Sequence, residues 1–521
     1  MMKDAMTKSE QLAKHVIQEA ENRGVLEFCI CPGARNSALM TELIKSAHLK
    51  KHYWFEERSA AFFALGRSRE SKRPVAVITT SGSAAGELLP ATMEAYYTGT
   101  PLLLITADRP RTYRGSGAPQ AAEQVGILGV YAPFFHDLAE GETFSLQTWN
   151  MHSPAHLNVC FSDSVSAVNP SCENTIQKTL SLNLEQFLEH SRHPLVIVSA
   201  LKAEAHPHVV DFLLSYKAPV FLEGVSGLRE DVRLRHLRIS RTDKIWTHAH
   251  KAEHLIDGVL RIGGVPTFRL WRDLEDKRGQ IAVCSISETS FSGLSWGTAH
   301  CAPLNTYFSE LSDTRIQKPI SCTAVTWLAA DSLHNQQLES LFHEEAEAEA
   351  SLIHHLSKRI PVGSHVYLGN SLPIREWDLA ACSEDRGLKV NASRGVNGID
   401  GQISTFLGLS KTEIDNWAIL GDLTTLYDMA GPWILSQMPD HSVNIVVINN
   451  SGGQIFSRMF PYKEFLNKHN LNFEPLAKMW GLHYERWTCV PEVIVPHKRR
   501  LIELVPDDCA TNRFWKRLEM I

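Results

Sequence analysis

The chain has 521 residues, 44% of them hydrophobic and 21% charged, with a formal net charge of −6. This length exceeds what one hydrophobic core usually serves, so we expect about three domains. The composition is typical of a globular protein rather than a disordered or fibrous one, and the net negative charge argues against a nucleic-acid partner.

The first segment, residues 1–21, is polar and predicts an amphipathic helix without the apolar core of a secretory signal. No apolar run reaches the roughly 18 residues that a membrane span requires. The ten cysteines are scattered, and Cys29 and Cys31 form the closest pair, which is not the spacing of a zinc site. We therefore expect a cytoplasmic protein with reduced cysteines and no membrane span.

Short, continuous apolar runs followed by turns of small residues characterise residues 1–183. The runs at 75–80 and 101–106 precede Ser81-Gly82-Ser83 and Ala107-Asp108. Continuous rather than alternating apolar strands are typical of parallel sheets that are covered on both faces. This pattern predicts a doubly wound α/β domain.

Two further α/β domains are predicted, a smaller one over 190–340 and a third over 350–521. Their apolar runs lie at 195–198, 219–222, 258–262, 280–283, 366–370, 417–422 and 443–448. Between them, residues 335–358 carry Glu, His and Leu at helical spacing, which predicts a solvated linker helix. The predicted fold class is therefore α/β, with three doubly wound parallel-sheet domains.

Polar residues follow two neighbouring strands of the third domain. Asp422 follows one strand, and Asn450 and Gly452 follow the next. Because the carboxyl ends of parallel strands converge, Asp422 and Asn450 could share a cation such as Mg²⁺, together with a backbone carbonyl near Gly452 and diphosphate oxygens. A helix beginning near Thr424 would direct its N-terminus at the same anion. The alternative is a turn and a helix cap without a ligand.

This arrangement resembles the diphosphate and metal site of thiamine-diphosphate-dependent enzymes. Leu423 stands where that superfamily commonly has Gly, and Gly-Asp-Leu followed by Asn-Asn-Ser-Gly-Gly-Gln-Ile-Phe at 449–456 resembles the menaquinone-pathway 2-succinyl-5-enolpyruvyl-6-hydroxy-3-cyclohexene-1-carboxylate synthases in particular. The resemblance spans the chain but is faint between 202 and 351. Its other motifs occur in chain order at 31–37, 80–84, 104–110, 117–120, 156–159, 369–375 and 393–401.

The resemblance implies thiamine diphosphate as cofactor, with Mg²⁺ or Mn²⁺ as the metal. It places the catalytic carboxylate, which activates the cofactor's aminopyrimidine, at Glu57, although a Glu-Glu-Arg run alone is more often a solvated helix face. Apolar neighbours of Glu57 favour a raised carboxyl pKa. The implied cofactor-binding residues are Glu57, Ser81, Gly82, Ile399, Gly421, Asp422, Leu423, Asn450, Gly452, Gln454, Ile455 and Phe456, with the metal on Asp422, Asn450 and Gly452.

The implied substrates, 2-oxoglutarate and isochorismate, each carry two carboxylates, which guanidinium groups bind through paired hydrogen bonds. A lone arginine would more often form a surface ion pair. Phe268 replaces the lysine of a family Lys-Arg pair in the middle domain. The implied substrate-binding residues are Ala34, Arg35, Arg109, Gln120, Arg269, Ser371, Arg375, Arg394, Ile455 and Phe456.

The implied reaction is decarboxylation of 2-oxoglutarate and conjugate addition of the resulting succinyl carbanion equivalent to isochorismate. Because Glu57 and Asp422 fall in different predicted domains, the resemblance implies that they meet across a subunit interface, in a homodimer at minimum and a homotetramer by expectation. Two alternatives stay open, namely another thiamine-diphosphate carboligase or decarboxylase of 2-oxo acids, and a non-catalytic homologue that binds metabolites. A dinucleotide site is disfavoured because 81–86 lacks the Gly-x-Gly-x-x-Gly spacing.

Overall fold

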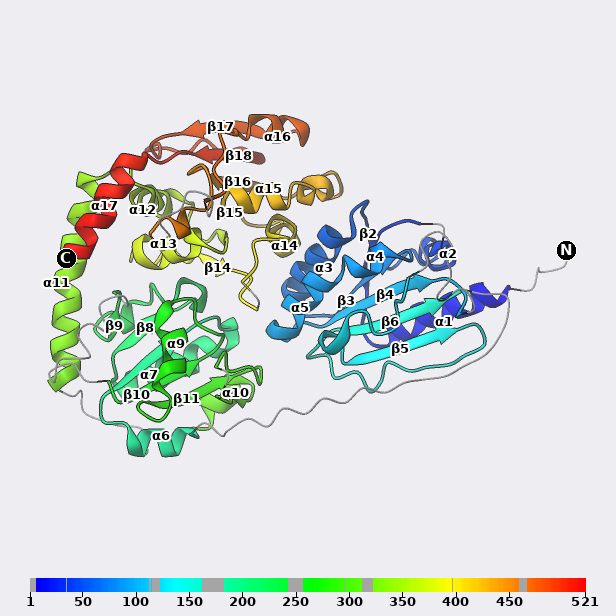
Figure 1. Cartoon of the computed structure of the whole chain (residues 1–521), viewed down its shortest axis with the longest axis horizontal. Coiled ribbons are helices and arrows are strands. Elements are labelled where there is room, and N and C mark those ends of the chain that lie inside the picture. The colour runs from blue at the N-terminus through cyan, green and yellow to red at the C-terminus, as the bar shows by residue number, and fades with distance from the viewer. Residues whose placement is uncertain are drawn as a thin grey trace. The chain divides into compact units, whose positions relative to one another are not determined.

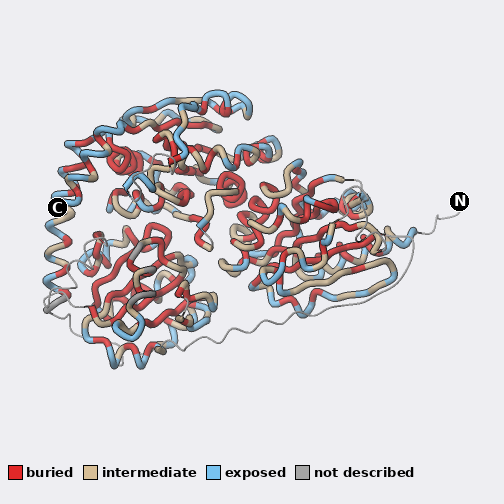
Figure 2. The backbone as a smooth tube through the Cα atoms, in the orientation of Figure 1, coloured by how far each residue is buried: buried red, intermediate tan, exposed pale blue. Residues whose placement is uncertain are grey.

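The computed structural model describes residues 6–33, 35–111, 114, 122–161, 182–241, 256–294, 296–311, 322–395, 397–458 and 466–521. Within these ranges the strands form three six-stranded sheets, and every strand pair is parallel (Figure 1). The α/β fold class predicted from the continuous apolar runs is confirmed. Figure 2 shows that the strands of the sheets are largely buried, as expected when helices cover both faces.

The first sheet has the strand order β2-β1-β3-β4-β6-β5. Its strands are β1 (Glu27–Ile30), β2 (Lys50–Tyr53), β3 (Val75–Thr79), β4 (Leu102–Asp108), β5 (Phe134–Ala139) and β6 (Ala155–Cys160). The accompanying helices are α1 (Lys8–Asn22), α2 (Ser37–Lys45), α3 (Glu57–Ser71), α4 (Ser83–Gly86), α5 (Leu89–Thr98) and the 3₁₀ helix η2 (Gly129–Tyr131). Side chains of α1 and α2 pack with those of the strands in one buried core.

The second sheet has the order β12-β11-β10-β7-β8-β9, and a separate core lies on each of its faces. Its strands are β7 (Pro194–Val198), β8 (Val220–Leu222), β9 (Arg238–Ile239), β10 (Gly258–Ile262), β11 (Ala282–Ser287) and β12 (His300–Cys301). Its helices are α6 (Leu184–His190), α7 (His206–Tyr216), α9 (Arg269–Asp273), α10 (Leu304–Ser309), η3 (Ala203–Ala205), η4 (Gly224–Ser226), η5 (Val232–Leu234) and η7 (Leu274–Lys277).

The third sheet has the order β14-β13-β15-β16-β18-β17. Its strands are β13 (His365–Leu368), β14 (Lys389–Asn391), β15 (Asn416–Gly421), β16 (Val443–Ile448), β17 (His483–Trp487) and β18 (Arg499–Leu504). The helices of this region are α11 (Cys322–Glu344), α12 (Glu349–Arg359), α13 (Leu372–Ala380), α14 (Gln402–Leu409), α15 (Asp422–Tyr427), α16 (Glu474–Met479), α17 (Asp508–Met520), η9 (Gly431–Gln437) and η10 (Gln454–Phe456).

The prediction of one solvated linker helix over 335–358 is wrong. The helix α11 ends at Glu344, the chain turns, and α12 begins at Glu349. Ala348 and Ala350 are fully buried, and Glu349 is only 2% exposed. The Glu-Ala alternation therefore marks the point where the chain enters the core of the third sheet, and α12 is a core helix.

The described chain divides into two compact units. Unit 1 comprises 1–174, 398–410 and 425–440, and unit 2 comprises 175–397, 411–424 and 441–521. Each sheet lies within one of the three predicted ranges, and we keep those ranges as a proposal for the domain boundaries. The two late segments of unit 1 were not anticipated, because only tertiary packing reveals that α14 lies on α3.

Two glycines at the contact between α3 and α14 explain this packing. A Cβ atom at Gly66 of α3 would lie 2.3 Å from the carbonyl oxygen of Thr405, and one at Gly408 of α14 would lie 2.3 Å from that of Phe63. The two helix backbones can approach this closely because neither glycine has a side chain.

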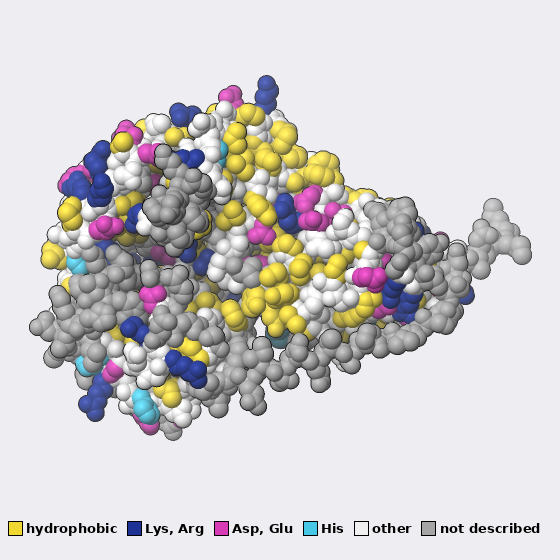
Figure 3. Space-filling model, in the orientation of Figure 1, with side chains coloured by type: hydrophobic (Ala, Val, Ile, Leu, Met, Phe, Trp, Pro, Cys, Tyr) yellow, Lys and Arg dark blue, Asp and Glu magenta, His cyan; other side chains and the backbone are white. Residues whose placement is uncertain are grey.

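No helix among the described residues is long and apolar enough to cross a membrane. On the face drawn in Figure 3, acidic and basic side chains of the described residues are interspersed rather than gathered by sign.

Candidate active site

Glu57 occupies the first turn of α3 in unit 1, just beyond the end of β2. Its neighbour Glu56 is the N-cap residue, and the Glu56 carboxylate accepts hydrogen bonds from the backbone N–H groups of Arg58 (3.1 Å) and Ser59 (2.8 Å). Glu57 is therefore left for another task. Burial raises the pKa of Glu57, and the charges of Glu56 and Glu87 raise it further. α3 is buried along most of its length, so it is not a solvated helix.

The predicted cofactor residues Ser81 and Gly82 follow β3 and are both buried. Gly82 has φ 83° and ψ −136°, a conformation that L-residues rarely adopt, and its N–H donates to Oε1 of Gln124 at 2.7 Å. A Cβ at Gly33 would lie 2.5 Å from Cβ of Thr80, so the loop after β1 lies directly on the loop after β3. Half-buried Arg35 belongs to that first loop, whereas the predicted residues Ala34 and Gln120 lie outside the described residues.

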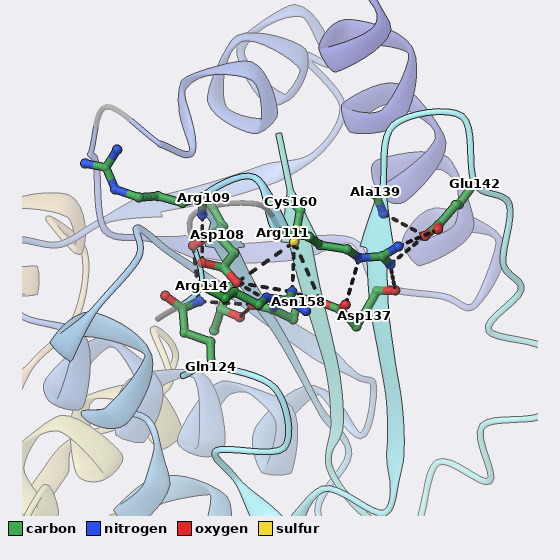
Figure 4. A network of polar contacts seen from close by, with 12 residues as sticks. Asp108, Arg109, Arg111, Arg114, Gln124, Asp137, Ala139, Glu142, Asn158 and Cys160 are labelled. Atoms are coloured by element: carbon green, nitrogen blue, oxygen red, sulfur yellow. Dashed lines mark hydrogen bonds and ion pairs between the residues drawn. The ribbon is translucent and has the colours of Figure 1, made fainter. Parts of the chain in front are cut away.

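An ion-pair network joins the ends of β4, β5 and β6 (Figure 4). Asn158 donates through Nδ2 to Asp108 (2.9 Å) and Asp137 (2.8 Å), and Nη2 of Arg114 lies 2.6 Å from Oδ1 of Asp137. Burial opposes ionisation of Asp137, but hydrogen bonds from Arg114 and Asn158 outweigh it and lower the Asp137 pKa. Because Arg114 also approaches Cys160 at 3.2 Å, a guanidinium rather than a metal occupies this cluster.

The predicted substrate residue Arg109 is the neighbour of Asp108 at the edge of this network. Its backbone N–H donates to Oδ1 of Asp108 at 2.7 Å, while its guanidinium points away from the network in Figure 4. The network therefore anchors the backbone of Arg109. Arg111 also forms ion pairs, with its Nε 3.0 Å from Oδ2 of Asp137 and its Nη1 2.7 Å from Oε1 of Glu142.

In unit 2 the carboxyl ends of β15 and β16 converge, as the sequence predicts. Asp422 accepts from the backbone N–H of Leu423 (2.6 Å) through Oδ1 and from that of Gly452 (2.8 Å) through Oδ2. Burial raises the Asp422 pKa even though these hydrogen bonds, and Nε2 of His469 at 3.2 Å, favour the ionised form. The helix α15 begins at Asp422, two residues before the predicted start at Thr424.

Asn450 follows β16, and the nitrogen and oxygen of its side-chain amide have different surroundings. Nδ2 donates to both carboxylate oxygens of Glu349, at 2.9 and 3.1 Å, whereas Oδ1 is buried without a hydrogen-bond donor among the described residues. The backbone carbonyl of Asn450 accepts from the Gln454 side chain at 3.0 Å. A buried amide oxygen with no partner is a candidate metal ligand.

The backbone of the loop between Asn450 and Gln454 lies close to that of Leu466. Gly452 has φ 131°, and a Cβ there would lie 2.4 Å from the carbonyl oxygen of Leu466. A carboxylate, an amide oxygen and nearby backbone carbonyls form an all-oxygen set, which suits a hard divalent cation. The residues present therefore fit the implied metal. Ile455 is half-buried and Phe456 is 37% exposed, both on η10.

Three further predicted substrate residues of unit 2 follow β13 and β14. Arg394 is buried and donates to Oδ1 of Asn370 at 2.5 Å. Ser371 has the unusual φ of 73°, and exposed Arg375 donates to its carbonyl oxygen at 2.6 Å. The Arg269 side chain lies outside the described residues.

Ile399 is half-buried and belongs to unit 1, not to the unit that contains Asp422. Gly421 and Leu423 flank Asp422 at the end of β15.

Sequence reasoning missed Gln124, Glu349 and His469. Each contacts a predicted site residue from a segment that is distant in the sequence. The sequence offered one signal for these residues, which is that Glu349 stands directly before an apolar stretch.

Comparison with known proteins supports the resemblance. Residues 10–127 match the family model described as "Thiamine pyrophosphate enzyme, N-terminal TPP binding domain". The chain is 43% identical to the 2-succinyl-5-enolpyruvyl-6-hydroxy-3-cyclohexene-1-carboxylate synthase of Bdellovibrio bacteriovorus, over 98% of this chain and 99% of the relative. The synthases of the same name from Akkermansia muciniphila and Lysinibacillus sphaericus are 36% and 28% identical, over 98% and 95% of this chain and 99% and 95% of their own lengths.

Proposed function

Because the chain belongs to the family of 2-succinyl-5-enolpyruvyl-6-hydroxy-3-cyclohexene-1-carboxylate synthases, we propose that it decarboxylates 2-oxoglutarate and adds the resulting succinyl carbanion equivalent to isochorismate. The cofactor is thiamine diphosphate, which supplies a nucleophilic carbon and an electron sink when bound. The observation that carries the proposal is the hydrogen bond from Gly452 to Asp422 at the carboxyl ends of β15 and β16, beside an Asn450 whose Oδ1 is buried without a hydrogen-bond donor among the described residues.

Each proposed cofactor role follows from an environment described above. Glu57 exchanges a proton with the aminopyrimidine, because its raised pKa favours the protonated form that donates. Asp422, Asn450 and the Gly452 backbone hold Mg²⁺ or Mn²⁺, which binds the diphosphate. The backbone around Ser81 and Gly82 approaches the cofactor closely. The apolar side chains proposed to line the cofactor are Ile399, Leu423, Ile455 and Phe456, with Gly421 and Gln454 shaping the loops.

The substrate carboxylates are bound by arginines. Arg35 and Arg109 in unit 1 are half-buried, whereas Arg375 in unit 2 is exposed and Arg394 is buried. All four follow strand ends, where ligands of parallel sheets bind. Planar guanidinium groups provide paired donors for these carboxylates. The further proposed substrate contacts are Ala34, Gln120, Arg269, Ser371, Ile455 and Phe456.

A homodimer at minimum, and a homotetramer in full, is the proposed assembly. Glu57 belongs to unit 1 and Asp422 to unit 2, so we propose that they meet across the interface between two copies. Exposed aromatic residues near the start of α3 support this. Phe55 is 58% exposed and Trp433 is 39% exposed. Their rings pack edge-on, with 4.9 Å between the ring centroids. Large exposed apolar side chains that cluster in this way mark interaction surfaces.

The experiment that tests the function measures carbon dioxide release from 2-oxoglutarate with thiamine diphosphate and Mg²⁺, with and without isochorismate. We expect release that depends on isochorismate and falls at least about a hundredfold in Glu57→Gln, the range of general acid–base catalysis. Glu56→Gln is the matched control, because its one side-chain oxygen can still accept a cap hydrogen bond.

The alternatives predict different results. Release from pyruvate but not from 2-oxoglutarate would assign the chain to another branch of thiamine-diphosphate enzymes. No release from either acid, with no calorimetric signal on adding thiamine diphosphate and Mg²⁺, would identify a non-catalytic homologue.

A further inference from the structure

The side-chain amide of Asn450 is held from one side by a buried carboxylate. Its Nδ2 lies 2.9 and 3.1 Å from the two oxygens of Glu349. A carboxylate accepts hydrogen bonds, so the nitrogen rather than the oxygen of the amide must face Glu349. The amide oxygen consequently faces the opposite side, where it is buried without a donor among the described residues.

Glu349 is itself buried and held by its backbone. It is the first residue of α12, its backbone N–H donates to Oγ1 of Thr511 at 3.0 Å, and it is 2% exposed. The carboxyl group of Glu349 is therefore held inside the fold at the start of α12.

We propose that Glu349 is a positioning residue that presents Oδ1 of Asn450 to the divalent metal. An asparagine amide can turn over and offer NH₂ instead of oxygen, and NH₂ cannot bind a cation. Here such a turn would place Oδ1 against the carboxylate of Glu349, so the amide orientation in which Oδ1 faces away from Glu349 is strongly preferred. The inference rests on the proposed function, which supplies the metal.

The test is Mn²⁺ binding by the full-length protein in the presence of thiamine diphosphate, followed by electron paramagnetic resonance. Groups that orient metal ligands typically contribute 10- to 100-fold in affinity, so Glu349→Leu should weaken Mn²⁺ binding by about that factor. Glu349→Gln keeps one acceptor oxygen and should weaken binding less. Glu345→Gln is the matched control, because Glu345 lies in the turn between α11 and α12 and pairs with Arg513 at 2.9 Å instead of contacting Asn450. Its Mn²⁺ affinity should match that of the wild type.

A donor–acceptor exchange separates positioning from a general structural role. Asn450→Asp alone sets a carboxylate against Glu349 and should lower Mn²⁺ affinity more than about tenfold. Adding Glu349→Gln restores one donor facing one acceptor, keeps the net charge of the wild-type pair and leaves an oxygen for the metal. The double variant should therefore bind Mn²⁺ more tightly than Asn450→Asp, whereas two independent structural losses would add.

Two results would overturn the inference. One is Mn²⁺ affinity in Glu349→Leu within about twofold of the wild type, and the other is a double variant that binds no better than Asn450→Asp. Failure of the proposed cofactor and metal site is distinguishable from both, because the wild type would then bind no Mn²⁺ with thiamine diphosphate. Failure of the proposed reaction alone is read from carbon dioxide release and leaves Mn²⁺ binding in place. Thermal denaturation of each variant identifies any that fails to fold. If Glu349→Leu does not fold, Glu349→Gln, which retains an acceptor oxygen, is compared with the wild type for Mn²⁺ affinity instead.

Discussion

At the scale of single residues, the carboxylate of Glu57 is destabilising to the fold at neutral pH. Burial raises its pKa above the ordinary value of 4.5, so the folded state binds this proton more tightly than the unfolded state does. The Glu57 contribution to stability is then complete below the ordinary pKa and is lost as the pH rises through the raised one. Glu57→Gln should therefore increase the thermal midpoint at about pH 8 and leave it unchanged near pH 4.

Thermal denaturation of the cofactor-free protein across this pH range checks the prediction. Glu56→Gln is again the control, since removing a charged cap from a helix N-terminus costs about 0.3–1 kcal/mol and should lower the midpoint at pH 8. A Glu57→Gln midpoint that falls in parallel with that of the control would show that the Glu57 environment is not as described.

The site residues divide by how far their contacts reach along the chain. Asp422 and Asn450 were predictable, because each follows an apolar strand and parallel strands converge at one edge. Glu349 reaches Asn450 from 101 residues away, and the Gln124 side chain reaches Gly82 across 42 residues. No local pattern encodes such contacts, since they depend on which helix end the fold places beneath which loop.

At the scale of helices and strands, the sequence predicts the parallel sheets but not how helices cross. Continuous apolar runs distinguish buried strands without any knowledge of their neighbours. The alternation of Glu and Ala at 344–349 was misleading. The pattern is typical of a solvent-exposed helix, but Glu349 is buried and accepts hydrogen bonds from Asn450. The approach of α3 to α14 has a similar cause, since two glycines 342 positions apart are informative only as a pair.

For the contact between α3 and α14, helix propensity and packing predict opposite effects of Gly66→Ala on stability. Helix propensity alone would make Gly66→Ala stabilising by up to about 1 kcal/mol. The 2.3 Å approach to the carbonyl oxygen of Thr405 instead predicts destabilisation, and overpacking typically costs about 1–3 kcal/mol. The thermal midpoint should thus fall in Gly66→Ala and in Gly408→Ala.

Gly86→Ala is the matched control for this experiment. Gly86 is also helical, but the nearest atom to its added Cβ is Cδ1 of Ile127 at 3.9 Å, an ordinary contact. Its midpoint should stay level or rise. Equal midpoints in Gly66→Ala and Gly86→Ala would contradict the close backbone approach of α3 and α14.

At the scale of the whole molecule, the proposed catalytic groups are distributed between two compact units, with Glu57 in one and Asp422 in the other. If each site combines Glu57 of one copy with Asp422 of a second, two inactive variants should complement each other. A dimer containing one Glu57→Gln chain and one Asp422→Ala chain would have one site with both defects and one site with neither.

Equal co-expression of the two variants should accordingly restore about a quarter of wild-type activity, because half of randomly assorted dimers are mixed and half of their sites are intact. Each variant expressed alone provides the background. A site formed within one chain would carry a defect in every copy, so activity at the background level would overturn the shared-site arrangement while leaving the proposed reaction intact. Recovery that disappears when the two proteins are purified separately and assayed without subunit exchange would show that the intact sites form only on assembly of mixed dimers.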